Sequence, residues 1–405
     1  MRPTADPRAT SRSAVLSALL AGRPMERSEI VRATGLSRAT VFRVLDDLQS
    51  HGLVHNAAAI ARPGQGRPST PAVFTGASKL VCGIDLGGTH ARFAVADALG
   101  RTLVRATIPT PTDINGPDMG RVIARYVQRL VSTLSGDQGP LAALTIGVPG
   151  AVSGDKAQVV ASHNLPHIVG TEFIESLRHA AGVPVSLDND SNLALVGELR
   201  YGGLAKKETA VLLTLGTGLG SAVAIDGRIL RGPAGLLGEF GRLHVPGAST
   251  RLRDLVSGAG LPGYARSLGY DVHRAQEILD TPQNYPDVYA LVRDSLLHVV
   301  SLVALAYEPR TVTMTGGFAD GLADSVLTEV QEGVHDLVGV RTRVRRTTLG
   351  DSAGLLGTLS VALGNLYASL GILEEHVIAT DVDRRPAIAA LDQAPVGDVG
   401  VTTPS

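Results

Sequence analysis

The chain has 405 residues, of which 44% are hydrophobic and 19% charged, so it is neither a mainly disordered protein nor a single ordinary domain. Its formal net charge of −1 hides an uneven distribution, because residues 1–80 carry a balance of +6 and the remaining residues one of −7. The single cysteine, Cys82, excludes an internal disulfide framework and a cysteine-rich zinc site.

The basic N-terminal segment contains three short helical patterns, over residues 11–20, 26–33 and 38–50. Ser37 immediately precedes the third pattern and is a good N-cap for it. The apolar residues of the third pattern recur at helical spacing and are expected in a core: Val41, Val44, Leu45 and Leu48. The segment therefore predicts a small three-helix unit.

Two short strands, Leu53–Val54 and Ala72–Phe74, are expected next, with a glycine-rich turn over residues 61–69 between them. The order helix, helix, helix, hairpin is typical of a winged helix-turn-helix, which binds double-stranded operator DNA. Glycines beside an arginine allow the wing to approach a narrow minor groove closely. The residues expected to contact DNA are Ser37, Arg38, Thr40 and Arg43 on the third helix and Arg67 in the wing. A three-helix protein-interaction module with solvated arginines is the alternative, because arginine is the prevailing basic residue of the whole chain.

A change of composition after Lys79 marks the start of a second unit. Residues 80–86 form a buried-strand pattern that ends in a glycine turn, and further strands are expected over 91–97 and 103–108. A strand, a glycine turn and a second strand suit a triphosphate, because main-chain N–H groups can approach the phosphates and Asp85 can hold Mg²⁺ through water.

The same pattern occurs again later in the chain. A second glycine turn, residues 215–220, lies between strands expected over 210–215 and 221–225, and a third, residues 314–318, follows a long helix over 289–307. This repetition predicts a duplicated fold that clasps a nucleotide between two lobes. The candidate phosphate-binding residues are Asp85, Gly87, Gly88, Thr89, Thr217, Gly218, Gly316 and Gly317.

Six ordered motifs make the chain similar to the ROK family (repressor, open reading frame, kinase) over about residues 11–372. The motifs are Gly83–Thr89, Ile146–Gly150, Asn164–Pro166, Asn189–Asn192, Gly216–Gly220 and Gly238–Gly241. The resemblance implies an α/β fold, the two-lobed actin-like ATPase (ribonuclease H-like) fold, preceded by an all-α/winged-helix DNA-binding domain. The implied domains are a DNA-binding domain 1–78, a sugar-kinase-like domain 79–375 and a disordered tail 376–405. Within the second, the small lobe is expected over about 79–188 plus a helix at 359–372, and the large lobe over about 189–358.

The resemblance also implies roles for particular residues. In the sugar kinases of the family, the aspartate that matches Asp190 is the general base on the sugar hydroxyl. Asn164, Asn189 and Glu239 match positions that bind sugar hydroxyls. The alternative for Asp190 is a structural turn, because its neighbours are typical helix-capping residues and a helix is expected over 193–201.

Two departures from the family pattern concern zinc. Arg242 stands where the family has a histidine that binds zinc and touches sugar, and residues 246–253 replace the three-cysteine zinc loop. Arg253 falls where a second sugar-binding glutamate usually stands, although Asp254 can take over that role. We therefore expect no zinc and no required cofactor, and ATP with Mg²⁺ remains an open alternative. His163, His167 and His244 have no metal-ligand spacing and are expected to be ordinary loop or pocket histidines.

The DNA-binding head and the missing zinc loop favour a transcriptional regulator, a repressor whose kinase-like domain senses a sugar, over an ATP-dependent sugar kinase. A bifunctional regulator with residual kinase activity through Asp190 is a third interpretation. A two-fold operator requires at least a dimer, so a homodimer or homotetramer is expected. The longest strongly apolar stretch, His298–Tyr307, is shorter than the roughly 20 residues of a membrane span, and the N-terminus is polar, so we expect a cytoplasmic protein without a membrane partner.

The charge of the effector stays open at this stage. Arg242 and Arg253 move the expected sugar pocket towards positive charge, and a buried arginine needs an anionic partner. Either Glu239 and Asp254 supply that partner and the effector is a neutral sugar, or the effector brings the charge as a sugar phosphate or sugar acid.

Overall fold

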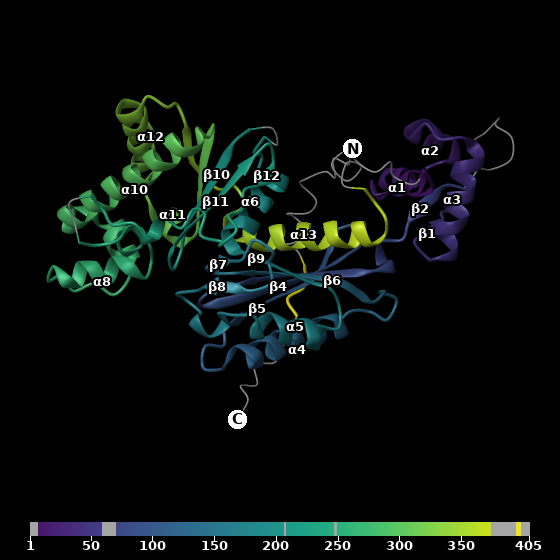
Figure 1. The fold of residues 1–405 in the computed structure, drawn as a ribbon, viewed down its shortest axis with the longest axis horizontal. Helices are drawn as coiled ribbons and strands as arrows, with labels where there is room; N and C mark the ends of the chain where they lie inside the picture. The colour runs from purple at the N-terminus through teal and green to yellow at the C-terminus, as the bar shows by residue number, and fades with distance from the viewer. Residues whose placement is uncertain (1–6, 59–69, 206–207, 247–248, 374–393, 398–405) are drawn as a thin grey trace.

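The computed structural model describes residues 7–58, 70–205, 208–246, 249–373 and 394–397, which form a small head and a two-lobed body (Figure 1). The head contains helices α1 (Pro7–Leu19), α2 (Arg27–Thr34) and α3 (Arg38–Ser50) and the antiparallel strands β1 (Val54–Asn56) and β2 (Ala72–Phe74). The predicted order of three helices and a hairpin is thus confirmed. The predicted wing turn, residues 61–69, lies outside the described residues.

Local chemistry fixes the ends of the two helices that form the helix-turn-helix. The Ser37 hydroxyl accepts a hydrogen bond of 3.1 Å from the main-chain N–H of Thr40, so the predicted N-cap of α3 is confirmed. Gly35 ends α2 with a φ of 69°, a left-handed conformation that glycine adopts at little cost. The apolar stripe predicted for α3 is buried in the head: Val41, Val44, Leu45 and Leu48.

The first lobe is built on a five-stranded mixed sheet with the strand order β5-β4-β3-β6-β9. Its strands are β3 (Leu80–Leu86), β4 (His90–Asp97), β5 (Thr102–Pro109), β6 (Leu141–Val148) and β9 (Val185–Asn189). A two-stranded hairpin, β7 (Ala151–Val152) and β8 (Val159–Ala161), extends from it, and helices α4 (Gly116–Ser132) and α5 (Glu172–Ala181) cover one face (Figure 1). Short 3₁₀ turns, Gly76–Ser78 and Pro166–Ile168, precede β3 and follow β8.

The second lobe repeats this plan with the strand order β12-β11-β10-β13-β14. Its strands are β10 (Ala210–Leu215), β11 (Leu219–Ile225), β12 (Arg228–Ile229), β13 (Thr311–Thr315) and β14 (Arg343–Arg346). Its helices are α7 (Leu252–Leu255), α8 (Gly260–Ser267), α9 (Ala275–Asp280), α10 (Pro286–Tyr307), α11 (Gly317–Gly321) and α12 (Asp324–Val338), with 3₁₀ turns at Phe240–Arg242, Pro282–Asn284 and Gly350–Ser352. In both lobes an antiparallel hairpin is joined by a parallel strand, β6 on β3 and β13 on β10, which confirms the predicted duplication.

Two helices, α6 (Asp190–Tyr201) and α13 (Ala353–Ser369), pack against each other where the lobes meet. Their backbones approach so closely that a Cβ on Gly357 would lie 1.7 Å from the carbonyl oxygen of Leu193, so only glycine fits there. The second helix was predicted over 359–372 and begins six residues earlier, at the rim of the space between the lobes.

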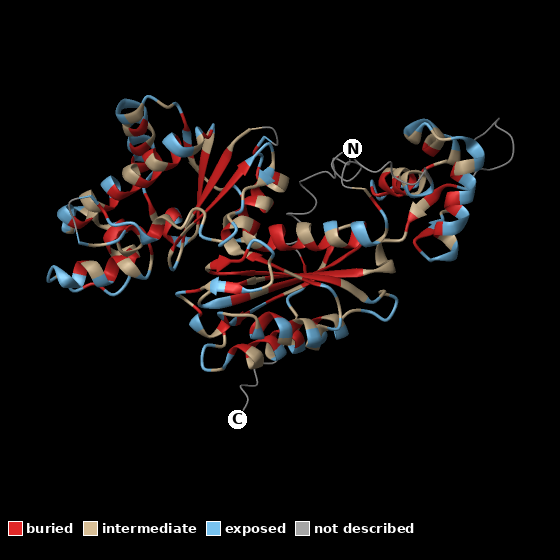
Figure 2. Ribbon diagram, viewed as in Figure 1, coloured by how far each residue is buried: buried red, intermediate tan, exposed pale blue. Residues whose placement is uncertain are grey.

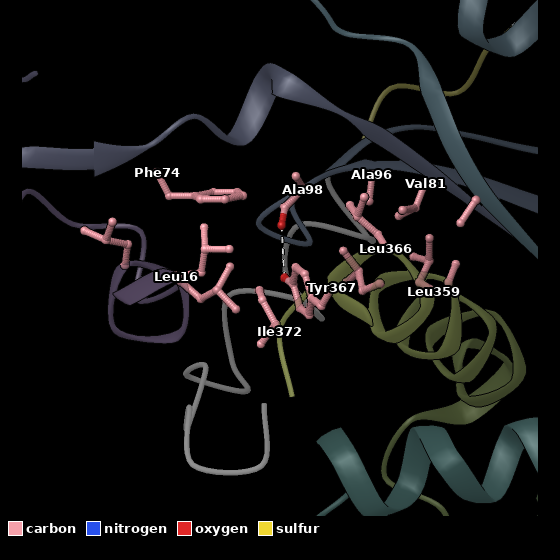
Figure 3. Packing of buried hydrophobic residues seen from close by; sticks show 14 of the residues in the cluster. Leu16, Phe74, Val81, Ala96, Ala98, Leu359, Leu366, Tyr367 and Ile372 are labelled. Carbon is pink, nitrogen blue, oxygen red and sulfur yellow. Dashed lines mark hydrogen bonds between the residues drawn. The ribbon is translucent and has the colours of Figure 1, made fainter. Parts of the chain in front are cut away.

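The head shares one hydrophobic core with the body. Leu16 and Phe74 of the head belong to the same buried cluster as Leu366, Tyr367 and Ile372 at the C-terminal end of α13 (Figure 3). Figure 2 shows buried residues on α1 in the head and, alternating with less buried ones, along α13 in the body. The head therefore packs directly against the body and is not merely connected to it by a linker.

Helix α10 is long and apolar enough to cross a membrane by length and composition alone, with a mean hydropathy of 1.6. The apolar stretch noted in the sequence, His298–Tyr307, is only the C-terminal part of this helix, so the sequence pattern did not predict a segment of membrane-spanning length. Half of the apolar window is buried inside the second lobe, where α10 packs on α12 and α7, as expected of a core helix in a folded lobe.

The C-terminal tail was predicted to be disordered, and the four described residues 394–397 contradict this locally. The main-chain N–H of Arg105 donates to the carbonyl of Pro395 at 3.0 Å, and the N–H of Gly397 donates to the carbonyl of Arg105 at 2.8 Å. These bonds extend the edge of the first sheet at β5, whose free edge can pair with any extended segment. The rest of the tail lies outside the described residues.

Candidate functional site

A large cleft of about 1030 Å³ lies between the two lobes, and both sheets contribute to it. It is lined by all fourteen residues predicted for the body: Asp85, Gly87, Gly88, Thr89, Asn164, Asn189, Asp190, Thr217, Gly218, Glu239, Arg242, Arg253, Gly316 and Gly317. The ends of strands β3, β9, β10 and β13 meet here, so turns that are far apart in the sequence face one cavity.

The glycine turns leave the main chain open to the cleft. No atom lies within 4 Å of a would-be Cβ on Gly216 or Gly317. Gly316 differs, because its φ is 99° and a Cβ would lie 2.6 Å from the Leu215 carbonyl oxygen. Here the backbone of the second lobe turns sharply, and glycines at such a turn allow a phosphate to approach the main chain closely.

Asp85 is the penultimate residue of strand β3 on the first lobe, and its carboxylate faces an arginine. Arg92, its partner in the β3–β4 register, lies 3.5 Å from Asp85 and 3.1 Å from Asp351. Burial raises the pKa of Asp85, and the nearby Arg92 charge opposes that rise. The acidic side chain predicted to hold Mg²⁺ is therefore partly neutralised from within the protein.

Asp190 is the first residue of α6, and its carboxyl group lines the cleft. Burial, together with the negative charges of Asp85 and Glu239, raises the pKa of Asp190 to about 7. Its oxygen accepts from the main-chain N–H of Ser191 at 2.7 Å. A carboxyl group that titrates near neutral pH in a cleft is suited to exchange a proton with a bound hydroxyl.

The helix cap next to Asp190 is Asn189, and this limits what Asn189 can do for a ligand. Its side-chain oxygen accepts from the N–H groups of Ser191 and Asn192, and its amide nitrogen donates to the Gly150 carbonyl at 2.7 Å. Asn189 lines the cleft, but its oxygen and one N–H of its amide are bonded within the fold, so only the second N–H remains for a ligand.

Asn164 lies between the glycine turns of the two lobes. The would-be Cβ of Gly88 is 3.2 Å from the Asn164 Cβ, and that of Gly218 is 4.0 Å from its amide nitrogen. The structure shows no hydrogen bond for this side chain among the residues it describes. Its amide is therefore placed to bind a ligand hydroxyl from the floor of the cleft.

The two arginines are only loosely paired with acids. Arg242 lies 3.9 Å from Glu239, and Arg253 lies 3.9 Å from Asp254. The guanidinium of Arg253 donates instead to the Nε2 atom of His163 at 2.8 Å, a contact between the second lobe and the first. Burial raises the pKa of Glu239, and both arginines oppose that rise.

Zinc does not fit the place where the family resemblance implies it. Arg242 cannot coordinate a metal, and Cys82 is buried in β3, where its only hydrogen-bond partner among the described residues is the Gly83 carbonyl. Within the described ranges, no three His, Cys, Asp or Glu side chains are grouped as metal ligands would be. That the folded protein carries no zinc stays a prediction.

The candidate DNA surface is the exposed face of α3. Arg38 and Arg43 are exposed on it, whereas the Thr40 hydroxyl lies 2.9 Å from the Ser37 hydroxyl and serves the helix cap. Ser37 and Thr40 thus position the N-terminus of α3. Arg67 lies outside the described residues, and no described contact tests any of these five as a DNA ligand.

Several contacts between cleft residues escaped the sequence analysis because the two partners are distant in the chain. Arg92 and Asp351 are 259 positions apart, and His163 and Arg253 are 90 apart. Outside the cleft, the buried carboxylate of Asp188 on β9 accepts from Arg231 of the second lobe at 2.7 Å and forms a further link between the lobes. No periodicity or motif marks such pairs.

Comparison with known proteins agrees with both parts of this architecture. The sequence pattern of the ROK family matches residues 81–365, and that of the IclR helix-turn-helix domain matches residues 13–57. A glucokinase of Halalkalibacterium halodurans is 26% identical over 308 residues, which are 68% of this chain and 92% of the glucokinase. A xylose repressor of Caldicellulosiruptor bescii is 25% identical over 231 residues, 57% of either chain.

A solved structure resembles both head and body. It is a ROK family transcriptional regulator described as a homologue of the E. coli Mlc protein, which covers 92% of this chain and 99% of its own, with a TM-score of 0.71 and 18% identity. At that identity it establishes the fold alone. The family pattern spans well over half of the sequence, and the chain therefore belongs to the ROK family, with a helix-turn-helix domain in front of its kinase-like body.

Proposed function

We propose that this helix-turn-helix member of the ROK family represses transcription and that a sugar bound in the interlobe cleft releases it from its operator. The observation that carries the proposal is the direct seating of a DNA-binding head on a body that contains an open, polar cleft. A regulator needs both parts, whereas a sugar kinase needs only the second.

Helix α13 connects the cleft to the DNA-binding head. Its first residues, Ala353 and Gly354, line the cleft, and a Cβ on Gly354 would lie 3.0 Å from the Asp85 carboxylate. Its last turn contacts the head, where the Arg12 side chain approaches the Leu370 carbonyl at 3.5 Å. Beyond the helix, the N–H of Leu373 donates to the Ser13 hydroxyl at 2.8 Å. A lobe movement that shifts one end of this helix must shift the other, because a helix is rigid over 17 residues.

The polar groups of the cleft match a polyol. Asn164 offers a donor and an acceptor, and Asp190 and Glu239 offer carboxyl oxygens, so hydroxyl groups can be bound in both directions. Sugars bind better when such groups converge on one wall than when they are scattered. The proposal assigns no cofactor to this step.

The oligomeric state and the cellular location follow from the proposed target, which is operator DNA. A palindromic operator is read by two heads related by two-fold symmetry, so the working form is a homodimer or a homotetramer. Because genomic DNA is the partner, the protein acts in the cytoplasm.

The test is release from DNA. The full chain is bound to a labelled duplex from upstream of its own gene, and anisotropy is followed during titration with a panel of hexoses, pentoses, disaccharides and their phosphates. At least one sugar should release the DNA, and Asp190→Ala should raise the concentration needed for half-release about tenfold or more, as expected when a charge-assisted hydrogen bond is lost. Asp336→Asn, an exposed acid on α12, is the matched control. Equal DNA affinity after removal of residues 1–78 would contradict the assignment of the head.

A second candidate, residual sugar kinase activity, is favoured by the proton affinity of Asp190 and by the open glycine turns. Bound ATP would supply the phosphoryl group, and Asp85, Gly218 and Gly317 are the groups placed to hold its phosphates and Mg²⁺. ADP formation is measured with Mg-ATP and the same sugars for the wild type and Asp190→Asn. Sugar-dependent turnover that disappears in Asp190→Asn would make the protein bifunctional, and equal background in both would leave regulation as its function.

A further inference from the structure

The exposed face of α3 carries an aromatic side chain that the motifs did not single out. Phe42 is 40% exposed and is the large hydrophobic residue that the described part of the head leaves most open to solvent. It lies one turn beyond Arg38 and next to Arg43, on the face that a recognition helix turns towards DNA.

Its partner is the first residue of α2. The guanidinium carbon of Arg27 lies 4.4 Å from the centre of the Phe42 ring, which is cation–π geometry. The Phe42 ring is the contact that the structure shows for the Arg27 guanidinium. This guanidinium makes no ion pair with any described carboxylate. Two other arginines of the head are neutralised internally, Arg12 by Asp47 and Arg23 by Glu29. Arg27 therefore keeps its full charge at the edge of the α3 face.

We propose that Phe42 is a positioning residue that holds the Arg27 guanidinium ready to bind a DNA phosphate beside the recognition helix; this rests on the proposed DNA-binding function of the head. A free arginine loses side-chain entropy when it binds a phosphate, and a guanidinium already stacked on a ring has lost much of it beforehand. The stacked face leaves the guanidinium edge, with its N–H donors, free for the phosphate oxygens. Phe42, which carries no charge, thereby determines how strongly the Arg27 guanidinium binds the phosphate.

This role differs from base reading. A phenylalanine that read bases would contact a thymine methyl group and would discriminate thymine from uracil in the duplex. A phosphate contact carries no such discrimination but depends on salt, because each phosphate neutralised releases counterions. The two roles therefore predict different measurements on the same variants.

The test uses the full chain and a duplex selected by it from a random-sequence pool, with affinity measured from low to high salt. Arg27→Ala should weaken binding about tenfold and reduce the slope of log K against log salt by about 0.9 for each head bound. Phe42→Leu keeps apolar bulk but removes the aromatic face, and should weaken binding about two- to fivefold. Phe42→Trp should retain wild-type affinity, because the indole ring also stacks on a guanidinium.

The decisive comparison is the double variant. In the Arg27→Ala background, Phe42→Leu should not weaken DNA binding any further. Arg32, an exposed arginine of α2 away from the ring, provides the control. In the Arg32→Ala background, the factors by which the two substitutions weaken DNA binding should multiply. Equal losses from Phe42→Leu with and without Arg27 would overturn the proposal. So would loss, in Phe42→Leu alone, of a wild-type preference for thymine over uracil at one operator position. If the wild type binds no duplex from the pool, the DNA-binding function fails as well, which separates that failure from a failure of the Phe42 role.

Discussion

The phenolic hydroxyl of Tyr367 donates a hydrogen bond of 3.0 Å to the main-chain carbonyl of Ala98, which ties the last turn of α13 to the turn after β4 (Figure 3). Burial raises the pKa of the Tyr367 phenol, so the hydroxyl keeps its proton and remains a donor. Ala98 is buried in the cluster shared by head and body. The bond thus fixes α13 at the place where the head is seated.

We expect Tyr367→Phe to lower the free energy of unfolding by about 1 kcal/mol, because the Ala98 carbonyl loses its donor in a buried place. The measurement is urea unfolding of the full chain. Tyr126→Phe, on α4, is the control, since the Tyr126 ring contacts Phe93 and, among the described residues, its hydroxyl has no hydrogen-bond partner. Equal stability of Tyr367→Phe and the wild type would mean that water replaces the phenol at Ala98.

The sequence predicted the helices and strands well because their patterns are local. The N-cap at Ser37, the strands of both hairpins and the glycine turns each depend on residues within one element. The convergence of the eight predicted phosphate-binding residues on one cleft followed from the repeated glycine turns, and that of the other six cleft residues from the family resemblance. What escaped depends on pairs that only the tertiary fold brings together, such as Arg253 with His163 and Tyr367 with Ala98.

Asn189 shows a different limit of sequence reasoning. Its motif correctly marks the cleft wall, but the motif cannot show that the start of α6 already bonds the amide oxygen and that Gly150 accepts one of the two N–H groups. The seating of the head was equally hidden, because the apolar residues of α1 fit an isolated three-helix unit as well as a shared core.

The pH dependence of stability should reveal the carboxyl group of Asp190. Its pKa is about 7 in the folded chain and about 3.9 in an unfolded one, so the folded chain binds the proton more tightly. Its contribution to stability is therefore fully present below about pH 3.9 and is lost as the pH rises through about 7. In Asp190→Asn this loss should be absent, and the unfolding free energies of variant and wild type, measured from pH 4 to 8, should diverge in favour of the variant as the pH rises. Parallel curves would show that Asp190 is solvated in the folded protein.

Arg43 and Arg67 should contribute to DNA binding in different ways. Arg43 is exposed on α3, so Arg43→Ala should cost about 1–3 kcal/mol of binding free energy and change the base preference of the selected sites. Arg67→Ala should mainly reduce affinity for sites with A·T-rich flanks. Selection from a random pool followed by sequencing gives both readouts. An unchanged base preference for Arg43→Ala would remove this residue from the reading face.

Elemental analysis should find no stoichiometric zinc in the folded protein after mild chelation, because Arg242 and the single Cys82 leave no tetrahedral set of nitrogen and sulfur ligands. The chelated protein should also unfold at the same temperature as the untreated one. Zinc that survives chelation and stabilises the fold would indicate a site built from histidines and carboxylates.

The charge balance of the cleft decides which form of the sugar should bind. Arg242 and Arg253 each have an acid 3.9 Å away, Glu239 and Asp254, so each positive charge has a loosely paired negative charge of the protein nearby even without a ligand. The Arg242 side chain is 51% exposed and keeps water, so it lacks the desolvation that would demand an anionic partner.

Towards the glycine turns, the balance becomes acidic, because Asp85 and Asp351 face the single charge of Arg92. A neutral sugar therefore meets no net repulsion in the cleft, whereas a phosphate adds negative charge to a wall that already holds Asp190. We expect the releasing sugar to bind at least as tightly as its phosphate in calorimetric titrations. Arg242→Ala should change both affinities by a similar factor, because the arginine balances Glu239 and does not bind a ligand anion. A phosphate that binds tenfold more tightly than its parent sugar, with the advantage lost in Arg242→Ala, would instead assign Arg242 to an anionic effector.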